Sequence, residues 1–156
     1  MKVPKQKKKR GKLSCKYWIK QNDKLWSNII HLIFEEKDFI VDEKLNDLHP
    51  HHWHYNRTEF RLRWEILNGV LLNKENHNQA DSKDNALFEM KLYYAFNTKG
   101  HPYYNPRFEY NNTETLKSYL DKILLSSPKK LGLDFYIQKN EELNKIYNDL
   151  IVEKQL

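Results

Sequence analysis

Apolar side chains recur at helical spacing in the first third of the chain. Several lie three or four positions apart within residues 15–36, which places most of them on one side of a helix. These positions are Leu25, Ile29, Ile30, Leu32 and Ile33. The pattern predicts an amphipathic helix over residues 15–36, with Trp18, Trp26 and Phe34 packed in the core and Asp23 as an N-cap for its second half.

The second half of the chain shows the same periodicity in three further segments. They predict helices over residues 82–97, from Thr113 to about residue 126, and over residues 141–154. Glycine and prolines interrupt residues 98–111, which predicts a loop, and residues 129–136 are expected to form a linker with apolar side chains. No internal repeat is visible.

The region between these helical segments has shorter periods. Phe39 to Val41 predict either a strand or a buried turn. Residues 49–58 are expected to form a strand or an irregular hairpin arm. The alternation of Phe60, Leu62 and Trp64 with arginines is typical of a strand with one packed face and one basic face.

A turn and a second strand are expected to follow. Asn68-Gly69 is a hairpin turn signal, and Val70 to Leu72 form a short apolar run. The polar residues after Asn73 lead into a helix. The whole region therefore predicts a β-turn-β-α unit, and the chain as a whole predicts an α+β fold that is mostly helical.

Charge changes the picture at the start of the chain. Residues 2–16 carry eight Lys or Arg and no acid, while the whole chain has a net charge of +6. Residues 1–14 are therefore expected to be a disordered basic arm. In the functional interpretation, four of its residues contact nucleic-acid phosphates, namely Lys7, Lys8, Lys9 and Arg10. A solubilising tail remains the alternative.

Composition limits the class of protein further. The 156-residue chain is long enough for one domain with a hydrophobic core. No apolar run reaches the roughly 20 residues of a membrane helix, so we expect a soluble, cytoplasmic protein that binds no membrane. Cys15 is the single cysteine, which excludes a disulfide within the chain and fits a reducing compartment.

Five of the seven histidines lie between His49 and His77. Metal-assisted cleavage of a phosphodiester needs side chains that hold a divalent ion and a base that takes a proton from water. Histidine can do either at neutral pH. Where a strand bends into a loop, an adjacent pair such as His51-His52 can direct one ring to the metal and the next to the water. A histidine of a following helix can complete such a site. His31 and His101 are expected to be structural.

The order of His, Asn and His in this region, with the segment Leu62–Leu72 (LRWEILNGVLL) between them, resembles the HNH endonucleases. It is most similar to the phage-type members, including the lambda-type recombination endonucleases. The resemblance covers roughly residues 22–97, with Asp23-Lys24-Leu25-Trp26 in the leading helix. It implies a ββα-metal fold in the middle of the chain.

The family's roles, carried over by position, assign the site. The resemblance implies that His51 and His77 bind the metal, that His52 is the general base, and that Asn68 braces the loop carrying it. It also implies phosphate contacts for the nearby arginines, which are Arg57, Arg63 and, more weakly, Arg61. A shifted register, with His52 as a ligand and His54 reaching the water, stays open, and so does participation of His49.

The chain departs from this family at the zinc knuckles that many relatives carry. Asn73-Lys74-Glu75-Asn76 stand where the second Cys-x-x-Cys would be, and residues 39–44 replace the first. A four-cysteine zinc site cannot form, so packing must hold the fold instead. For the reaction we expect one divalent ion, magnesium or manganese, although imidazole ligands also accept zinc or nickel.

These observations predict a metal-dependent HNH nuclease that nicks or cleaves DNA, including branched DNA, in the cytoplasm of a phage host. The domain organisation expected is a basic arm (1–14), a nuclease core (15–111) and a C-terminal helical extension (112–156). Two alternatives remain. One is an HNH-like module that binds nucleic acid or a partner without cleaving. The other is an RNA-binding or ribosome-associated protein, suggested by the lysine-rich start.

Overall fold

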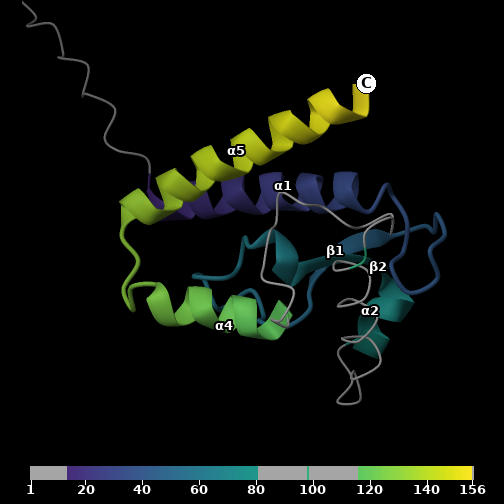
Figure 1. Ribbon diagram of the computed structural model, residues 1–156, viewed down its shortest axis with the longest axis horizontal. Coiled ribbons are helices and arrows are strands. Elements are labelled where there is room, and N and C mark those ends of the chain that lie inside the picture. Colours follow the sequence, from purple (N-terminus) through teal and green to yellow (C-terminus); the bar gives the residue numbers. More distant parts are fainter. Residues whose placement is uncertain (1–13, 81–97, 99–115, 156) are drawn as a thin grey trace, which may run out of the picture.

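The computed structural model describes residues 14–80, 98 and 116–155 (Figure 1). The arm residues Lys7, Lys8, Lys9 and Arg10 lie outside this part of the chain. So do the helix predicted over residues 82–97, nearly all of the predicted loop 98–111, and His101. The described residues form helices and a two-stranded antiparallel sheet, which confirms the mixed α+β class.

The first helix, α1, spans Cys15–Ile33 and begins where Ser14 caps it, with the Ser14 hydroxyl accepting from the backbone N–H of Tyr17 at 3.4 Å. It ends three residues before the predicted end because Glu35 and Glu36 have φ values of 53° and 59°. That left-handed backbone cannot continue an α-helix. The prediction that Asp23 caps a helix was wrong: Asp23 lies within α1, and its carboxylate is bonded to Arg63.

The sheet pairs β1 (Leu48–His52) with β2 (Gly69–Asn73), and α2 (Lys74–Ala80) follows directly (Figure 1). The antiparallel register runs from Leu48 opposite Asn73 to His52 opposite Gly69. Neighbouring residues of a strand point to opposite faces. His51 is therefore directed towards α2, where it meets His77, whereas His52 is directed towards α1, where it stacks on Trp26.

The connection between the strands, residues 53–68, differs from the prediction. Phe60 to Trp64 form turns rather than a strand, because successive backbone N–H groups bond three residues back, as in Leu62 to Glu59 and Glu65 to Leu62. Asn68-Gly69 is not a hairpin turn. A 3₁₀-helix, η1 (Ile66–Asn68), ends at Asn68, and Gly69 already belongs to β2. The expected turn is thus replaced by a folded loop.

Gly69 is needed for packing rather than for its backbone conformation. Its φ of −118° is open to any residue. A Cβ at this position would lie 2.5 Å from Ile30 Cδ1 and 2.5 Å from Trp26 Cζ2, both in α1. The absence of a side chain therefore lets α1 approach β2 closely, next to the strand position of His52.

Phe39 to Val41 form a turn, in which Phe39 is buried, Ile40 is half-buried and Val41 is exposed, and the neighbouring Asp38 holds it. The predicted alternative of a buried turn is therefore correct for Phe39 but not for Val41. The Asp38 carboxylate is fully buried. Its Oδ1 accepts from the N–H groups of Ile40 (2.8 Å) and Val41 (3.1 Å), and its Oδ2 accepts from Asn73 N–H (2.8 Å). One carboxylate therefore connects this turn to the junction of β2 and α2.

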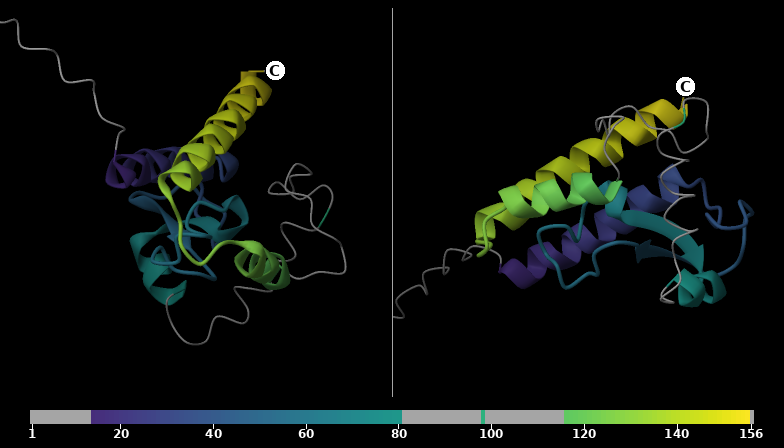
Figure 2. Two further views of the ribbon diagram at one scale, coloured as in Figure 1. Left: turned by 90° about the vertical axis from the view of Figure 1, so that its left-hand side faces the viewer. Right: turned by 60° about the horizontal axis from the view of Figure 1, so that its bottom comes forward.

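The C-terminal part consists of α4 (Leu116–Ser126) and α5 (Leu133–Gln155). α5 begins eight residues before its predicted start at Glu141, so much of the expected linker 129–136 is helix. The reason is tertiary packing: α5 lies alongside α1, and its first turns bury Tyr136 (Figures 1 and 2). Among the described helices, none is long and apolar enough to cross a membrane.

A buried amide pair fixes α5 against α1. Asn22 of α1 is fully buried, and its amide donates to the carbonyl oxygen of Tyr136 at 3.0 Å. Its oxygen accepts from the amide of Asn140 at 3.0 Å. Leu120, Leu143 and Leu150 of the C-terminal helices join the same hydrophobic cluster as α1 and the sheet. The C-terminal helices and the sheet region thus share one core.

Replacing Gly69 with alanine should lower the free energy of unfolding by about 1–3 kcal/mol, because the new methyl group overlaps Trp26 and Ile30. Thermal or urea unfolding measures the effect. Gly132→Ala is the matched control, since no atom lies within 4 Å of its added Cβ. A Gly69→Ala protein no less stable than Gly132→Ala would contradict the close approach of α1 to β2.

The change Asp38→Asn should cost about 2–3 kcal/mol of unfolding free energy. Both carboxylate oxygens of Asp38 accept hydrogen bonds from backbone N–H groups. An asparagine has only one accepting oxygen, so its NH₂ group would face a backbone N–H donor and leave that donor without a partner. Denaturant unfolding measures the loss. Asp47→Asn, at an exposed position, is the control and should change stability by less than about 0.5 kcal/mol. Equal stability of the two variants would be evidence against this role of Asp38.

Candidate active site

His51 and His77 meet at the contact between β1 and α2. Nδ1 of His51 lies 2.9 Å from Nε2 of His77, and the two rings are nearly perpendicular, with an interplanar angle of 79°. His51 is buried and His77 is half-buried. Residues 26 positions apart thus direct one ring nitrogen each to a common point.

The donor chemistry and spacing of this pair fit a divalent ion. Imidazole nitrogens are common ligands of divalent metal ions, and the two nitrogens lie close enough together to bind one ion. A hydrogen bond between a protonated and an unprotonated ring nitrogen also fits the observed 2.9 Å. Within the described ranges, no set of three or more His, Cys, Asp or Glu side chains could hold a metal.

His52 is held in one tautomer. Its Nε2 lies 2.9 Å from the carbonyl oxygen of Arg63, which can only accept, so Nε2 carries the proton and Nδ1 carries the lone pair. The ring is stacked on Trp26 with centroids 4.3 Å apart and an interplanar angle of 7°. Burial lowers the pKa of His52 below its ordinary value. The ring is therefore neutral at pH 7 and able to accept a proton at Nδ1.

Asn68 binds the loop that follows His52. Its side chain is fully buried, and its Oδ1 accepts from the backbone N–H groups of His54 (3.1 Å) and Tyr55 (3.0 Å). Its Nδ2 donates to the carbonyl oxygens of Tyr55 (2.8 Å) and Leu62 (3.4 Å). One amide thereby fixes both ends of the turns between β1 and η1.

The three arginines are placed differently from one another. Arg63 is mostly buried and forms a two-point ion pair with Asp23, at 2.8 Å and 2.7 Å, and its third nitrogen donates to the carbonyl oxygen of Arg57. Arg61 pairs with Glu59, at 2.7 Å and 3.0 Å. The Arg57 guanidinium is exposed and has no partner in the described part of the chain. Arg57 is therefore the most accessible of the three for a phosphate.

Among the described residues, no other histidine forms a metal-binding group with His51 and His77. His52 is directed to α1, on the opposite face of β1. His49 is exposed on β1, and His31 of α1 is bonded to Glu36 at 2.9 Å. His54 lies in the connection after β1, with its Nε2 3.6 Å from Oδ1 of Asp121 in α4. The alternative register in which His54 reaches the water stays a prediction.

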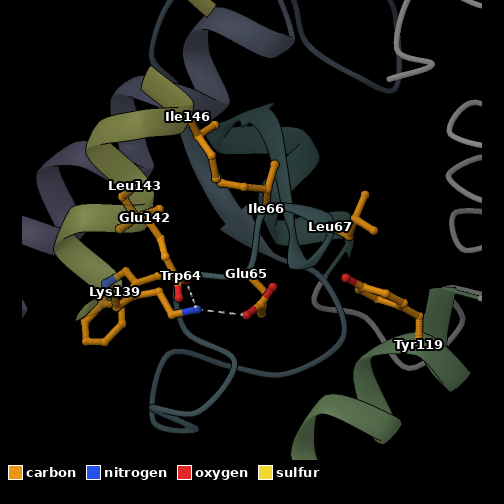
Figure 3. A pocket seen from close by; sticks show the side chains of 9 residues that line it. All are labelled: Trp64, Glu65, Ile66, Leu67, Tyr119, Lys139, Glu142, Leu143 and Ile146. Atoms are coloured by element: carbon orange, nitrogen blue, oxygen red, sulfur yellow. Dashed lines mark hydrogen bonds and ion pairs between the residues drawn. The ribbon is translucent and has the colours of Figure 1, made fainter. Parts of the chain in front are cut away.

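A small pocket lies between the connection and the two C-terminal helices (Figure 3). Lys139 of α5 reaches into it, with its Nζ 3.1 Å from Oε1 of Glu65 and 3.0 Å from Oε2 of Glu142. Burial alone would lower the pKa of Lys139, but the two carboxylates outweigh burial and raise it. The two carboxylates balance the charge of Lys139 within the protein. We therefore interpret this pocket as part of the packing between the loop and the C-terminal helices rather than as a candidate active site.

Sequence reasoning missed the contacts of three acidic residues that shape this region, namely Asp23, Asp38 and Asp121. Each of them binds a group that lies far along the chain. The tryptophan in the LRW segment was a usable signal for Asp23, since a buried indole N–H needs an acceptor and Trp64 donates to Asp23 at 2.9 Å. The other two carried no visible signal.

Comparison of the chain with protein-family models, with curated proteins and with solved structures gives no match. The geometry of the histidines and of Asn68, together with the resemblance of the motif, is therefore the basis for assigning a function.

Asn68→Asp should lower the free energy of unfolding by about 3 kcal/mol or more, because a buried charge replaces an amide that donates to two carbonyl oxygens. Chemical denaturation measures the loss. The same change at exposed Asn46 is the control, with an expected effect below about 0.5 kcal/mol. If both variants unfold at the same denaturant concentration, Asn68 does not hold the loop.

Proposed function

We propose that this protein is a divalent-metal-dependent HNH endonuclease that hydrolyses phosphodiester bonds of DNA. The observation that carries the proposal is the meeting of His51 Nδ1 and His77 Nε2 at 2.9 Å, on elements that follow the order strand, strand and helix. The motif of these elements resembles the HNH family, and a ββα-metal unit is the interpretation that we adopt for them.

In this proposal His51 and His77 hold the ion. When bound, a divalent cation stabilises the negative charge that develops on the scissile phosphate and the leaving oxygen. Magnesium or manganese is the expected ion, and the nitrogen ligands also accept zinc or nickel.

His52 acts as the general base in the proposed reaction, although its ring points to α1, on the face of β1 opposite the His51–His77 pair. Because His52 is the last residue of β1, the proposal requires the attacking water to reach Nδ1 around the end of the strand. The Nδ1 of His52 accepts the proton of this water, while the hydrogen bond from Nε2 to Arg63 fixes the orientation of the ring. The stacking on Trp26 keeps the ring in place. Asn68 has a supporting role, since it holds the loop whose later part supplies the Arg63 carbonyl oxygen.

The proposed substrate contacts come from the basic groups. The exposed Arg57 would bind the DNA backbone, and the arm residues Lys7 to Arg10 would add contacts without sequence preference. Arg61 and Arg63 were also assigned to phosphate. Their ion pairs with Glu59 and Asp23 favour a supporting part in the loop instead.

One observation favours the second candidate, an HNH-like module that binds DNA or a partner without cleaving it. The positions that correspond to the zinc knuckles of many relatives, residues 39–44 and Asn73-Lys74-Glu75-Asn76, carry no cysteine. A chain that has diverged at these positions can also have lost the catalytic function. Cleavage activity separates the two candidates.

The test is nicking of supercoiled plasmid in magnesium or manganese. His52→Ala should reduce the rate about a hundredfold or more, the usual contribution of a general base. His77→Ala should weaken binding of manganese, which calorimetric titration measures independently of cleavage. His31→Ala is the matched control, because this histidine bonds Glu36 at the end of α1 and should leave the rate unchanged.

Equal rates for the wild-type protein and His52→Ala would exclude His52 as the base. Loss of activity in His54→Ala but not in His52→Ala would support the shifted register. Failure of the wild-type protein to cleave supercoiled, branched or single-stranded DNA would contradict the nuclease and support the binding module.

A further inference from the structure

Asp121 of α4 binds two consecutive residues of the loop after β1. Its Oδ1 accepts a hydrogen bond from the Tyr55 hydroxyl at 2.6 Å and lies 3.6 Å from Nε2 of His54. The hydrogen bond to the carboxylate raises the pKa of Tyr55, so the phenol keeps its proton and remains a donor. Asp121 belongs to the C-terminal extension, to which the motif assigned no role.

The same two loop residues are held by Asn68 through their backbone. Asn68 Oδ1 accepts from the N–H groups of His54 and Tyr55, whereas Asp121 contacts their side chains. The fully buried Asn68 thus binds the loop from the core, and the partly exposed Asp121 binds it from α4. Residues 54 and 55 are fixed only while both contacts persist.

The other C-terminal helix binds the end of the same connection. Lys139 of α5 pairs with Glu65, with Nζ and Oε1 3.1 Å apart and both side chains mostly buried. Glu65 is two residues after Arg63, whose carbonyl oxygen accepts the His52 hydrogen bond. α4 and α5 therefore hold the beginning and the end of the segment that orients the His52 ring.

We propose that α4 and α5 form a positioning element for the candidate active site, with Asp121 as its principal positioning residue. The proposal rests on the nuclease function proposed above. Asp121 touches neither the metal ligands nor the His52 ring in this structure; it acts through the loop. Without it, residues 54 and 55 gain freedom, and the loop holds the Arg63 carbonyl oxygen less firmly against His52.

Amide hydrogen exchange tests the structural step without any need for cleavage. In Asp121→Ala the N–H groups of His54 and Tyr55 should exchange about three- to tenfold faster. The loss of one partly exposed hydrogen bond to a charged group should make local opening of the loop more frequent by about this factor. The amides of α1 should be unchanged. Asp149→Ala on α5, where the acid pairs only with exposed Lys145, is the matched control.

Further variants keep the test decisive if Asp121→Ala folds poorly. Asp121→Asn retains an oxygen that accepts from the Tyr55 hydroxyl, so it should preserve most of the protection. Tyr55→Phe should match Asp121→Ala in part, and the double variant should show less than the product of the two single effects. Unchanged exchange at both amides, or equal acceleration throughout the protein, would overturn the proposal.

Cleavage kinetics then test the functional step. Asp121→Ala should lower kcat about tenfold at unchanged KM, with most of the rate retained in Asp121→Asn. A raised KM at constant kcat would place Asp121 in substrate binding and overturn its positioning role. If the wild-type protein cleaves no DNA, the proposed function fails by itself, whereas the exchange experiment still decides whether Asp121 holds the loop.

Discussion

The buried amide of Asn68 is the interaction on which the candidate site depends. Residues 53–68 join two antiparallel strands without a regular ladder of their own, so their backbone groups need partners from side chains. Asn68 supplies two acceptor bonds and two donor bonds in the interior. An amide offers two donor hydrogens and an oxygen with two acceptor lone pairs in one planar group. The loop can therefore be irregular and still have one defined conformation.

Side chains from the surrounding helices complete this arrangement. The Trp26 indole donates to the carbonyl oxygen of Glu65 at 3.1 Å, and Asp23 bonds both Arg63 and Trp64. The groups that hold the loop are thus also the groups that pack the core. Trp26 likewise has two roles: its indole ring stacks on the His52 ring, and it packs against Gly69 in the core. In the proposed reaction, rigid elements that position the His52 ring in this way would reduce the cost of orienting it.

The sequence allowed prediction of elements with local signals. The periodicity of residues 15–33 and the order of strands and helix around the histidines were readable, because side-chain periods of 3.6 and 2.0 follow from backbone geometry. The alternation of Phe60, Leu62 and Trp64 gave the wrong element, since the same residues can be buried by turns whose bonds span three residues.

The early start of α5 and the contacts made by Asp121 depend on interactions between distant segments, which a single sequence does not encode locally. The expectation that His51 and His77 lie together rested only on the resemblance of the motif to the HNH family.

Asp38 connects this part of the fold without a structural zinc, which many proteins of the family that the motif resembles require. Their knuckles need four reduced thiols and a supply of zinc, whereas here a carboxylate joins the turn after α1 to the start of α2. Oxidants and chelators that disassemble a thiolate site have no such target in the described part of the chain, where Cys15 is exposed at the start of α1. If the proposed reaction metal binds, a chelator should remove the proposed activity and leave the described part of the fold intact, so loss of activity and loss of structure become separable events.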